Sequence, residues 1–393
     1  MKYSKNIAVV LGGYVNGYNI IRELHGNNVK NIALLGYSKS LAAFSNKIYK
    51  STLIEKSPES LLNALNELHD NKNYLIIYPT DDMHIEHLEK INAKIKHFSF
   101  LPMNIKNILK TMDKAWQYNF CKENDIPFPE FIELNKTNDL KKLFKANFPI
   151  LVKPKIRDDL KLNIFRNLYL KNLKHLNLNF DMLTKKINEG FTFVSTEVIP
   201  GDDSKIFAYV AYRDQNGTIL NEWIGKKLNQ YPDNFGVFSS ASNQAPKIIL
   251  EQGRKLVNRM NLMGICEPEF KYDLRDNKYK LMEINLRSMM WHRVGNLSGV
   301  NLQYSQYLDA TTKKVPKHTQ NQNEVVHFVY MKHELYNLFF RKNYFKSFLK
   351  NVFGSRKRDF ATFNFSDTKP FLFDLYCIIE GVIKRCLKVL RIK

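Results

Sequence analysis

The chain has 393 residues, of which 44% are hydrophobic and 25% are charged, so it is long enough for two or three domains. Its formal net charge of +22 predicts an acidic partner: a nucleotide, a nucleic acid or an anionic membrane. The four cysteines form no C-x-x-C pair, which argues against a disulfide framework or a zinc site and fits a reducing cytoplasm. Because no apolar run reaches about 18 residues and the N-terminus lacks a signal-peptide core, we expect neither a membrane span nor export.

The opening of the chain alternates strand and helix patterns. Apolar runs at residues 7–11 and 32–35 predict buried strands, and the segment 12–17, Gly-Gly-Tyr-Val-Asn-Gly, leads from the first of them into a helix. This order predicts a Rossmann-like parallel sheet whose glycine turn binds an anion or a carboxylate. The glycine spacing differs from G-x-G-x-x-G, so a dinucleotide site is not predicted.

Two acids follow the next predicted strand, residues 74–78. Asp81 and Asp82 stand at the carboxyl end of that strand, where ligands of parallel sheets bind, yet acids in this position also cap helices. We favour the capping interpretation over the ligand-binding one.

A helix is predicted from residue 105 to 116, and the segment ends at the two prolines of residues 125–129. Residues 148–154 then read as an apolar strand with one lysine near its end. Since an unpaired charge inside a sheet is costly, we expect Lys153 to lie where this strand emerges. The following residues 155–160 contain no glycine, so basic side chains, rather than a glycine-rich loop, would cover a phosphate there.

The middle of the chain continues with strand patterns at residues 191–199 and 205–212. The first of them runs into Pro-Gly-Asp-Asp. The segment 223–232 has the sequence Trp-Ile-Gly-Lys-Lys-Leu-Asn-Gln-Tyr-Pro, and a helix is predicted from 249 to 260. Gly264 follows and is expected to end this helix in a left-handed backbone conformation.

Residues 262–287 predict a hairpin of two strands joined by a polar turn at 274–278. Side chains alternate across a strand, so one face collects the polar groups, namely Glu267, Glu269, Lys271, Glu283, Asn285 and Arg287. Carboxylate and amide oxygens are the ligands that Mg²⁺ prefers. From spacing alone, an amphipathic hairpin with a solvated polar face is an equal alternative.

The last part of the chain is strongly basic. Residues 331–393 hold 14 Lys and Arg against five Asp and Glu, and apolar residues at helical spacing occur over 345–353 and 371–390. Aromatic and basic residues on a helix indicate contact with an anionic membrane surface. The alternative is that these helices dock on the protein's own core. Nucleic acid is not predicted as a partner, because no recognition motif accompanies the charge.

Five motifs occur in the order found in the ATP-grasp superfamily, carboxylate–amine ligase branch, and the layout is similar to that of D-aspartate ligase-type enzymes. They are Asp113-Lys114 before the prolines, Val152-Lys153-Pro154, Glu197-Val198-Ile199, Gly225-x-Lys227-x-x-x-Tyr231-Pro232, and Glu269-Phe270 paired with Glu283-Ile284-Asn285-Leu286-Arg287. Gly299-Val300-Asn301-Leu302 resembles the family's G-V-D-L ending, so the resemblance spans about residues 5–315.

The resemblance implies a nucleotide site. Lys114 and Lys153 would contact the phosphates of ATP, and Asp203 the ribose. The adenine edge would be read by the backbone of Glu197, Val198 and Ile199.

The resemblance also implies the residues that carry the chemistry. Glu269, Glu283 and Asn285 would bind magnesium, most simply two Mg²⁺ ions, with Mn²⁺ as an alternative metal. Lys227 would approach the transferred phosphoryl group, and Arg287 would contact a phosphate or an acyl phosphate.

We therefore predict an α/β protein with a Rossmann-like N-terminal (pre-ATP-grasp) domain, residues 1–112, and a two-subdomain ATP-grasp domain, residues 113–320. The lid would span about 127–196 and the metal-binding part about 197–320. A basic, aromatic helical extension, 321–393, would follow.

The predicted function is ATP-dependent joining of a small-molecule carboxylate and an amine through an acyl phosphate. The second substrate could be a lipid-linked cell-envelope precursor, with the protein cytoplasmic or peripheral on the inner face of the membrane. The alternative is a non-catalytic ATP-binding scaffold protein at the membrane surface. Biotin-dependent carboxylation is a third possibility, but no biotin-carrier segment is evident.

Overall fold

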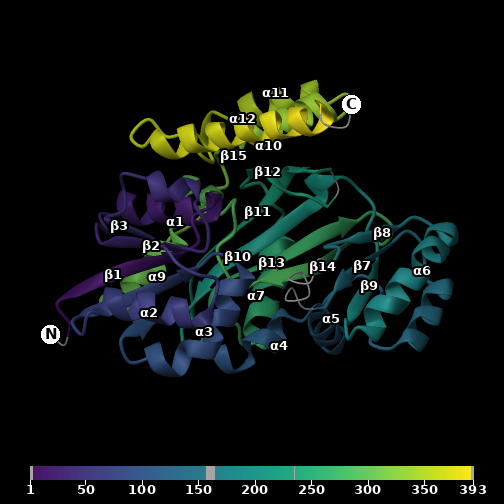
Figure 1. Cartoon of the computed structure of the whole chain (residues 1–393), viewed down its shortest axis with the longest axis horizontal. Helices are drawn as coiled ribbons and strands as arrows, with labels where there is room; N and C mark the ends of the chain where they lie inside the picture. Colours follow the sequence, from purple (N-terminus) through teal and green to yellow (C-terminus); the bar gives the residue numbers. More distant parts are fainter. Residues whose placement is uncertain (1–2, 156–163, 234, 391–393) are drawn as a thin grey trace.

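The computed structural model describes residues 3–155, 164–233 and 235–390, with side chains up to residue 380. These residues form three β-sheets with helices packed around them (Figure 1). The three cysteines whose side chains are described are free thiols. Among the described helices, none is long and apolar enough to cross a membrane.

The first sheet is parallel, with the order β3-β2-β1-β4-β5, as the opening β-loop-α-β pattern predicts. Its strands are β1 (Lys5–Leu11), β2 (Ile32–Gly36), β3 (Lys50–Leu53), β4 (Asn73–Pro79) and β5 (Ser99–Phe100). Alternate residues of β1 enter two different core clusters, so both faces of the sheet are covered. The covering elements are α1 (Val15–Gly26), η1 (Leu41–Phe44), α2 (Pro58–His69) and α3 (Asp82–Ile95).

The loops after β1 and β4 lie side by side, because the strand order reverses between these two strands. Gly12 has φ +88°, and a Cβ there would lie 2.3 Å from Thr80 Oγ1. Asn16 Nδ2 donates to the Thr80 carbonyl at 2.7 Å. The glycine turn is therefore held against the end of β4 at the edge where parallel sheets bind ligands.

A helical segment and a small antiparallel sheet come next. The predicted helix 105–116 is divided at Asp113, whose carboxylate accepts from the amides of Ala115 and Trp116 and so begins a new helix. The pieces are η2 (Ile105–Asn107), α4 (Ile108–Met112) and α5 (Lys114–Glu123). The sheet has the order β6-β9-β7-β8, with β6 (Phe131–Leu134), β7 (Ile150–Pro154), β8 (Leu168–Leu170) and β9 (Phe193–Glu197), and it carries η3 (Thr137–Lys145) and α6 (Leu173–Asn188).

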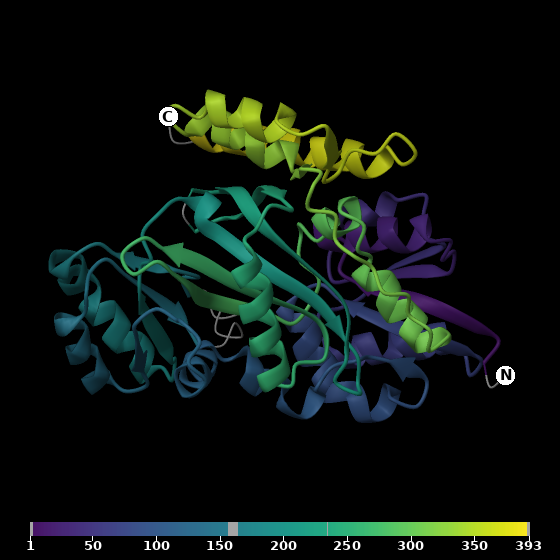
Figure 2. The same cartoon turned by 180° about the vertical axis from the view of Figure 1, so that it is seen from behind.

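The largest sheet has seven strands in the order β14-β13-β10-β11-β12-β15-β16. They are β10 (Ile206–Arg213), β11 (Ile219–Tyr231), β12 (Val237–Ser242), β13 (Gly264–Asp273), β14 (Lys278–Asn285), β15 (Val326–Val329) and β16 (Lys357–Phe360); η5 (Asp203–Lys205) precedes β10. The predicted hairpin is confirmed as β13 and β14, and its register sets Glu269 opposite Glu283. The helix predicted from 249 to 260 is α7 (Lys247–Arg259), which precedes the hairpin in the sequence. Helices α8 (Arg293–Leu297) and α9 (Leu302–Thr311) lie between this sheet and the first domain (Figure 2).

The C-terminal segment forms a further layer made of α10 (Met331–Phe340), α11 (Phe345–Phe353) and α12 (Lys369–Leu390), which we call the C-terminal layer. It lies across both the first domain and the seven-stranded sheet (Figures 1 and 2). The segment is not helical throughout, because β16 pairs with β15 and extends the sheet. Asp367 also accepts from Tyr18 and Ser45 of the first domain, so the segment is joined to the core on both sides.

Candidate active site

A cavity of about 750 Å³ is bordered by all three parts of the fold. The first domain contributes the loops after β1, β2 and β4, including Gly12, Tyr37 and Asp81. The two ATP-grasp-type sheets contribute strand side chains, and the C-terminal layer contributes Lys332 and Asp374. Residues from distant parts of the sequence therefore line one cavity.

Two carboxylates line the middle of this cavity. Glu269 and Glu283 are direct cross-strand partners on β13 and β14, so the hairpin brings them together. Lys227 reaches them from β11, with its Nζ 2.7 Å from Glu269 Oε2. Burial raises the pKa of the Glu269 carboxyl, and the Lys227 ammonium opposes this shift. The arrangement is an acidic pair that is only partly neutralised by one lysine.

A third acid, Glu267, lies behind this pair and is fully buried. Its Oε2 is 2.6 Å from His292 Nε2, and Asn285 Nδ2 donates to its Oε1 at 3.4 Å. The His292 ring receives the Met289 amide at Nδ1, so Nε2 carries the hydrogen in the bond to Glu267. Burial raises the pKa of Glu267 to about 7 and lowers that of His292 to about 3, which keeps the histidine neutral.

Arg287 follows β14 and connects the hairpin to the first domain. Its Nε donates to Asp82 Oδ1 at 2.6 Å. Asp81 instead caps α3 by accepting from the His84 amide at 2.8 Å. The preferred capping interpretation is therefore correct for Asp81, whereas Asp82 orients the cavity arginine.

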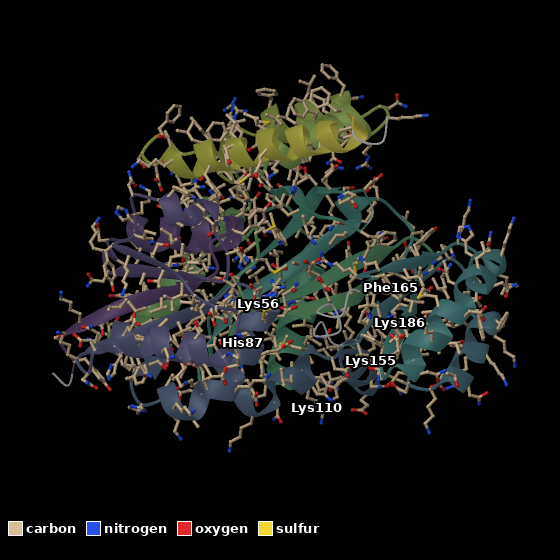
Figure 3. The ribbon with its side chains drawn as sticks, viewed as in Figure 1. Lys56, His87, Lys110, Lys155, Phe165 and Lys186 are labelled. Atoms are coloured by element: carbon tan, nitrogen blue, oxygen red, sulfur yellow. The ribbon has the colours of Figure 1, made fainter. Side chains whose placement is uncertain are left out.

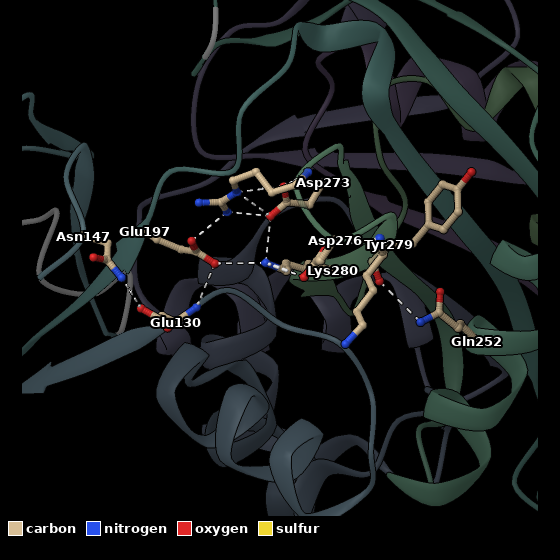
Figure 4. A network of polar contacts seen from close by, with 10 residues as sticks. Glu130, Asn147, Glu197, Gln252, Asp273, Asp276, Tyr279 and Lys280 are labelled. Atoms are coloured by element: carbon tan, nitrogen blue, oxygen red, sulfur yellow. Dashed lines mark hydrogen bonds and ion pairs between the residues drawn. The ribbon is translucent and has the colours of Figure 1, made fainter.

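The side chain of Glu197 is held in place by a polar network (Figure 4). Arg275 Nη2 and Lys280 Nζ donate to its carboxylate at 2.7 Å and 3.2 Å, and both also bind Asp273. Glu197 in turn accepts from the Glu130 amide at 3.2 Å. This network fixes the segment that leaves β9 and leaves its backbone beside the cavity.

The loop between β7 and β8 begins with an ion pair. Lys155, labelled in Figure 3, pairs with Glu133 of β6. The remainder of the expected phosphate-covering segment, 156–160, lies outside the described residues. Arg166, which precedes β8, also lines the cavity and offers a basic side chain there.

Most of the predicted site residues line the cavity: Lys114, Lys153, Glu197, Val198, Ile199, Lys227, Glu269, Glu283 and Arg287. Two do not. Asn285 contacts Glu267, one layer behind the lining. Asp203 is buried and accepts from the Gln230 amide at 3.0 Å, so its position gives no support to a ribose contact.

The acids fit a hard divalent cation. Glu269 Oε1 is buried and has no hydrogen-bond partner among the described residues, so an acceptor oxygen is left over beside Glu283. The described His, Cys, Asp and Glu side chains form no group of three or more that could hold a metal ion. A magnesium ion held by Glu269 and Glu283 would therefore draw on phosphate and water oxygens for the rest of its shell.

Comparisons with known proteins agree with this geometry. No protein-family model matches the chain. D-aspartate ligase of Enterococcus faecium is 24% identical over 317 residues, which cover 75% of this chain and 74% of the ligase. Among solved structures, the ADP complex of N5-carboxyaminoimidazole ribonucleotide synthetase has a TM-score of 0.63 at 14% identity, covering 83% of this chain and 81% of that one. L-amino acid ligase from Bacillus licheniformis has a TM-score of 0.56 at 15% identity, covering 79% and 75%.

The chain therefore resembles the ATP-grasp carboxylate–amine ligases in fold and in sequence. Along the chain the parallel first sheet precedes the four-stranded and seven-stranded sheets, and residues from all three sheets or their loops border the cavity.

Several residues of this ATP-grasp cavity were not among the predicted site residues. Arg166 stands outside any motif, so no signal in the sequence singled it out. Next to the lining, the hydrogen bond between His292 and Glu267 joins residues 25 positions apart and depends on the fold. Lys332 and Asp374 belong to the C-terminal layer, for which the sequence patterns favoured membrane contact, with docking on the protein's own core as the alternative, and gave no signal of a cavity wall.

Proposed function

We propose that this protein binds ATP with magnesium and joins a carboxylate to an amine through an acyl phosphate. One observation carries the proposal: Lys114, Lys153, the acidic pair and Arg287 face the same cavity as the glycine turn of the first domain. A nucleotide and a small carboxylate could therefore lie within one cavity. The relatives support ATP as the nucleotide, since several of the similar solved structures are complexes with ADP.

The proposed reaction has two steps. A carboxylate oxygen of the first substrate attacks the γ-phosphorus of ATP, the bond to the bridging oxygen breaks, and ADP leaves. The amine nitrogen of the second substrate then attacks the acyl carbon, phosphate leaves with the carbon–oxygen bond electrons, and the nitrogen loses a proton. The products are an amide, ADP and phosphate.

The chain's own residues position the reactants and balance charge. Lys114 and Lys153 hold the phosphates, and Lys227 approaches the phosphoryl group that is transferred. Arg287, oriented by Asp82, binds the acyl phosphate. Magnesium, when bound by Glu269 and Glu283, supplies charge neutralisation on the phosphates, and the assignment includes Asn285 as a ligand reached from the row behind.

At least one substrate is proposed to be an amino acid. The D-aspartate ligase and the L-amino acid ligase both name an amino acid as the compound they join. An α-amino acid supplies either reacting group, a carboxylate or an amine. The cavity volume of about 750 Å³ accommodates a nucleotide and a small second molecule.

The first test is thermal unfolding with and without Mg-ATP, for the native chain and for Glu283→Gln. At one hundred times Kd, a ligand adds about 2.7 kcal/mol to the free energy of unfolding. We expect a magnesium-dependent rise in the native chain that shrinks in the variant. Glu251→Gln, at an exposed position of α7 with a 3.8 Å ion pair to Lys247, is the matched control and should keep the full rise.

ADP release then tests turnover. Pairs drawn from the twenty amino acids, in L and D forms, are incubated with Mg-ATP, and ADP and amide are measured together. Release of ADP that depends on both substrates supports the ligase. A native chain that shows no stabilisation by Mg-ATP contradicts nucleotide binding, and one that is stabilised but never releases ADP with any substrate pair supports the non-catalytic scaffold.

The second part of the proposal places the protein at an anionic membrane surface, with a lipid-linked envelope precursor as one substrate. Helices α10 and α11 of the C-terminal layer leave four phenylalanines largely in solvent: Phe339, Phe340, Phe345 and Phe353 are 75%, 70%, 63% and 60% exposed. Figure 3 shows ring side chains on the side of this layer that faces away from the sheets. With a net charge of +9 over residues 331–393, this face suits anionic lipid headgroups.

The membrane proposal is tested with point substitutions, because residues 331–393 include β16 and part of the cavity wall. Removing the whole segment would damage the fold. The triple variant Phe340→Ser, Phe345→Ser, Phe353→Ser should bind vesicles of anionic phospholipid at least about tenfold more weakly than the native chain. Phe144→Ser, exposed on η3 of the lid, is the control. Equal binding by the triple variant and the native chain would rule out this face.

A further inference from the structure

The C-terminal layer forms one wall of the cavity, although it lies outside the region that resembles the ATP-grasp family. Lys332 of α10 and Asp374 of α12 both line it, together with Phe373 and Cys377. The glycine turn of the first domain, with Tyr14, faces them across the same space. A ligand at this end of the cavity would therefore contact side chains that no ATP-grasp motif supplies.

The two charged residues are paired and largely buried. Lys332 Nζ lies 3.2 Å from Asp374 Oδ1, and their side chains are 18% and 7% exposed. Tyr330 donates its hydroxyl hydrogen to the same Oδ1 at 3.1 Å, and its oxygen lies 3.0 Å from the Tyr14 hydroxyl. These contacts fix the position of the pair relative to the glycine turn.

The pair has hydrogen-bonding capacity left for a ligand. In the part of the chain that the structure describes, both hydrogen bonds to Asp374 end on Oδ1, and Oδ2 receives none. The Lys332 ammonium has three donors and gives one to Asp374. An acceptor and a donor of opposite charge thus stand side by side in the wall of a cavity.

We propose that Lys332 and Asp374 bind the zwitterionic head of an α-amino acid, the ammonium on Asp374 and the carboxylate on Lys332. This inference rests on the proposed function, and it assigns the binding of the amino-acid substrate to the C-terminal layer. The head of an α-amino acid carries the two opposite charges on two substituents of the same carbon, so two adjacent side chains of opposite charge can bind both. Lys39, which also lines the cavity, adds a second positive charge near this end, with its Nζ 5.9 Å from the centre of the Phe373 ring.

The experiment tests two variants, each against the amino acid and against two derivatives that lack one of its charges. Binding is measured by calorimetry on the full chain, in the presence of a non-hydrolysable ATP analogue and magnesium. The probes are the L and D amino acids and, for each one that binds, its des-amino carboxylic acid and its carboxamide. The variants are Asp374→Asn, which can still accept from Tyr330, and Lys332→Met.

Each variant should lose affinity for only those ligands that carry the group it binds. Asp374→Asn should weaken binding of the amino acid by about tenfold or more and leave binding of the des-amino acid unchanged. Lys332→Met should weaken binding of both the amino acid and the des-amino acid by a similar factor and leave binding of the carboxamide unchanged. Lys357→Met, in an exposed pair with Glu324 at 3.5 Å, is the control and binds all probes as the native chain does.

Three results would overturn the proposal. The first is that both variants bind the amino acid with native affinity. The second is that Asp374→Asn loses as much affinity for the des-amino acid as for the amino acid. The third is that the native chain, loaded with the nucleotide analogue, binds none of the amino acids. The first two leave the proposed ligase intact, because ADP release by the native chain is measured separately. Failure of Mg-ATP to stabilise the native chain is instead a failure of the proposed function.

Discussion

Arg287 and Asp82 are 205 positions apart in the sequence, and the Arg287 Nε donates to Asp82 Oδ1 at 2.6 Å. The arginine follows the strand that carries Glu283, and the aspartate begins helix α3 of the first domain. The pair therefore fixes the guanidinium at the boundary between the domain that precedes the ATP-grasp fold and the acidic hairpin. Any acyl phosphate bound by Arg287 would be positioned by both.

Substitution of Asp82 by Asn should lower both the free energy of unfolding and the rate of turnover. Arg287 is buried, and removal of one partner from a buried pair costs about 3–5 kcal/mol because the other charge stays uncompensated. Asp82 is itself partly exposed, so we expect the lower end of that range. Urea unfolding measures the loss, and ADP release measures turnover.

The control for this substitution is Asp81→Asn. Asparagine caps a helix about as well as aspartate, so the first turn of α3 should be kept. The control should therefore unfold within about 0.5 kcal/mol of the native chain. Equal destabilisation by both variants would mean that Asp82 acts through the helix terminus and not through Arg287.

Substitution of Lys227 by Met should reduce turnover more than nucleotide binding. Its ammonium is 2.7 Å from Glu269 and lines the cavity, where it would meet charge that develops on the transferred phosphoryl group. Loss of one such group typically lowers kcat by about 10²-fold or more. Steady-state kinetics and ATP titration give the two quantities. Lys226→Met, on the opposite face of β11, should keep native turnover; a matching loss there would contradict a specific role for Lys227.

Substitution of Asp273 by Asn should weaken ATP binding from a distance. Hydrogen bonds from Arg275 and Lys280 hold the pKa of Asp273 well below its usual range, and the same two cations hold Glu197 (Figure 4). Without the carboxylate, the segment after β9 should lose its fixed position, and we expect Kd for ATP to rise about tenfold. Asp276→Asn, at the exposed edge of the network, should bind ATP normally.

The stability of the chain should fall as the pH rises from 4.5 to 7, partly because of Glu23. Burial raises the pKa of this carboxyl from 4.5 to about 7, although it accepts from the Tyr304 amide and from Asn296. A carboxyl with a higher pKa in the folded chain stabilises the fold below the lower value and loses that contribution as the pH rises. The loss is about 3 kcal/mol.

Urea unfolding at several pH values tests the role of Glu23. Glu23→Gln should show a smaller decrease in the free energy of unfolding between pH 4.5 and 7 than the native chain, whatever its absolute stability. Glu67→Gln, at an exposed position of α2, should retain the native slope. An unchanged slope in Glu23→Gln would show that other groups cause the pH dependence.

Local patterns predicted several strands of the first sheet and the central hairpin correctly. The apolar runs at 7–11, 32–35 and 74–78 form strands of one parallel sheet, because a strand buried on both faces needs a continuous apolar sequence. Alternation of side chains in 262–287 was enough to gather the acids on one face of the hairpin, and the register in the structure then sets Glu269 opposite Glu283. The predicted helix from 105 to 116 is in fact divided, because the cap at Asp113 competes with helical continuation.

The sequence by itself therefore determined which groups are available for chemistry on each strand, since alternation and periodicity are local properties. Only the tertiary structure decided which of them meet. Asp82 reaches Arg287, Glu267 reaches His292, and Lys332 and Asp374 enter the cavity wall through contacts between elements that are distant in the chain. Asp203 and Asn285 are excluded from the lining for the same reason: the packing of neighbouring strands and helices, which no local pattern encodes, sets the face that each side chain presents.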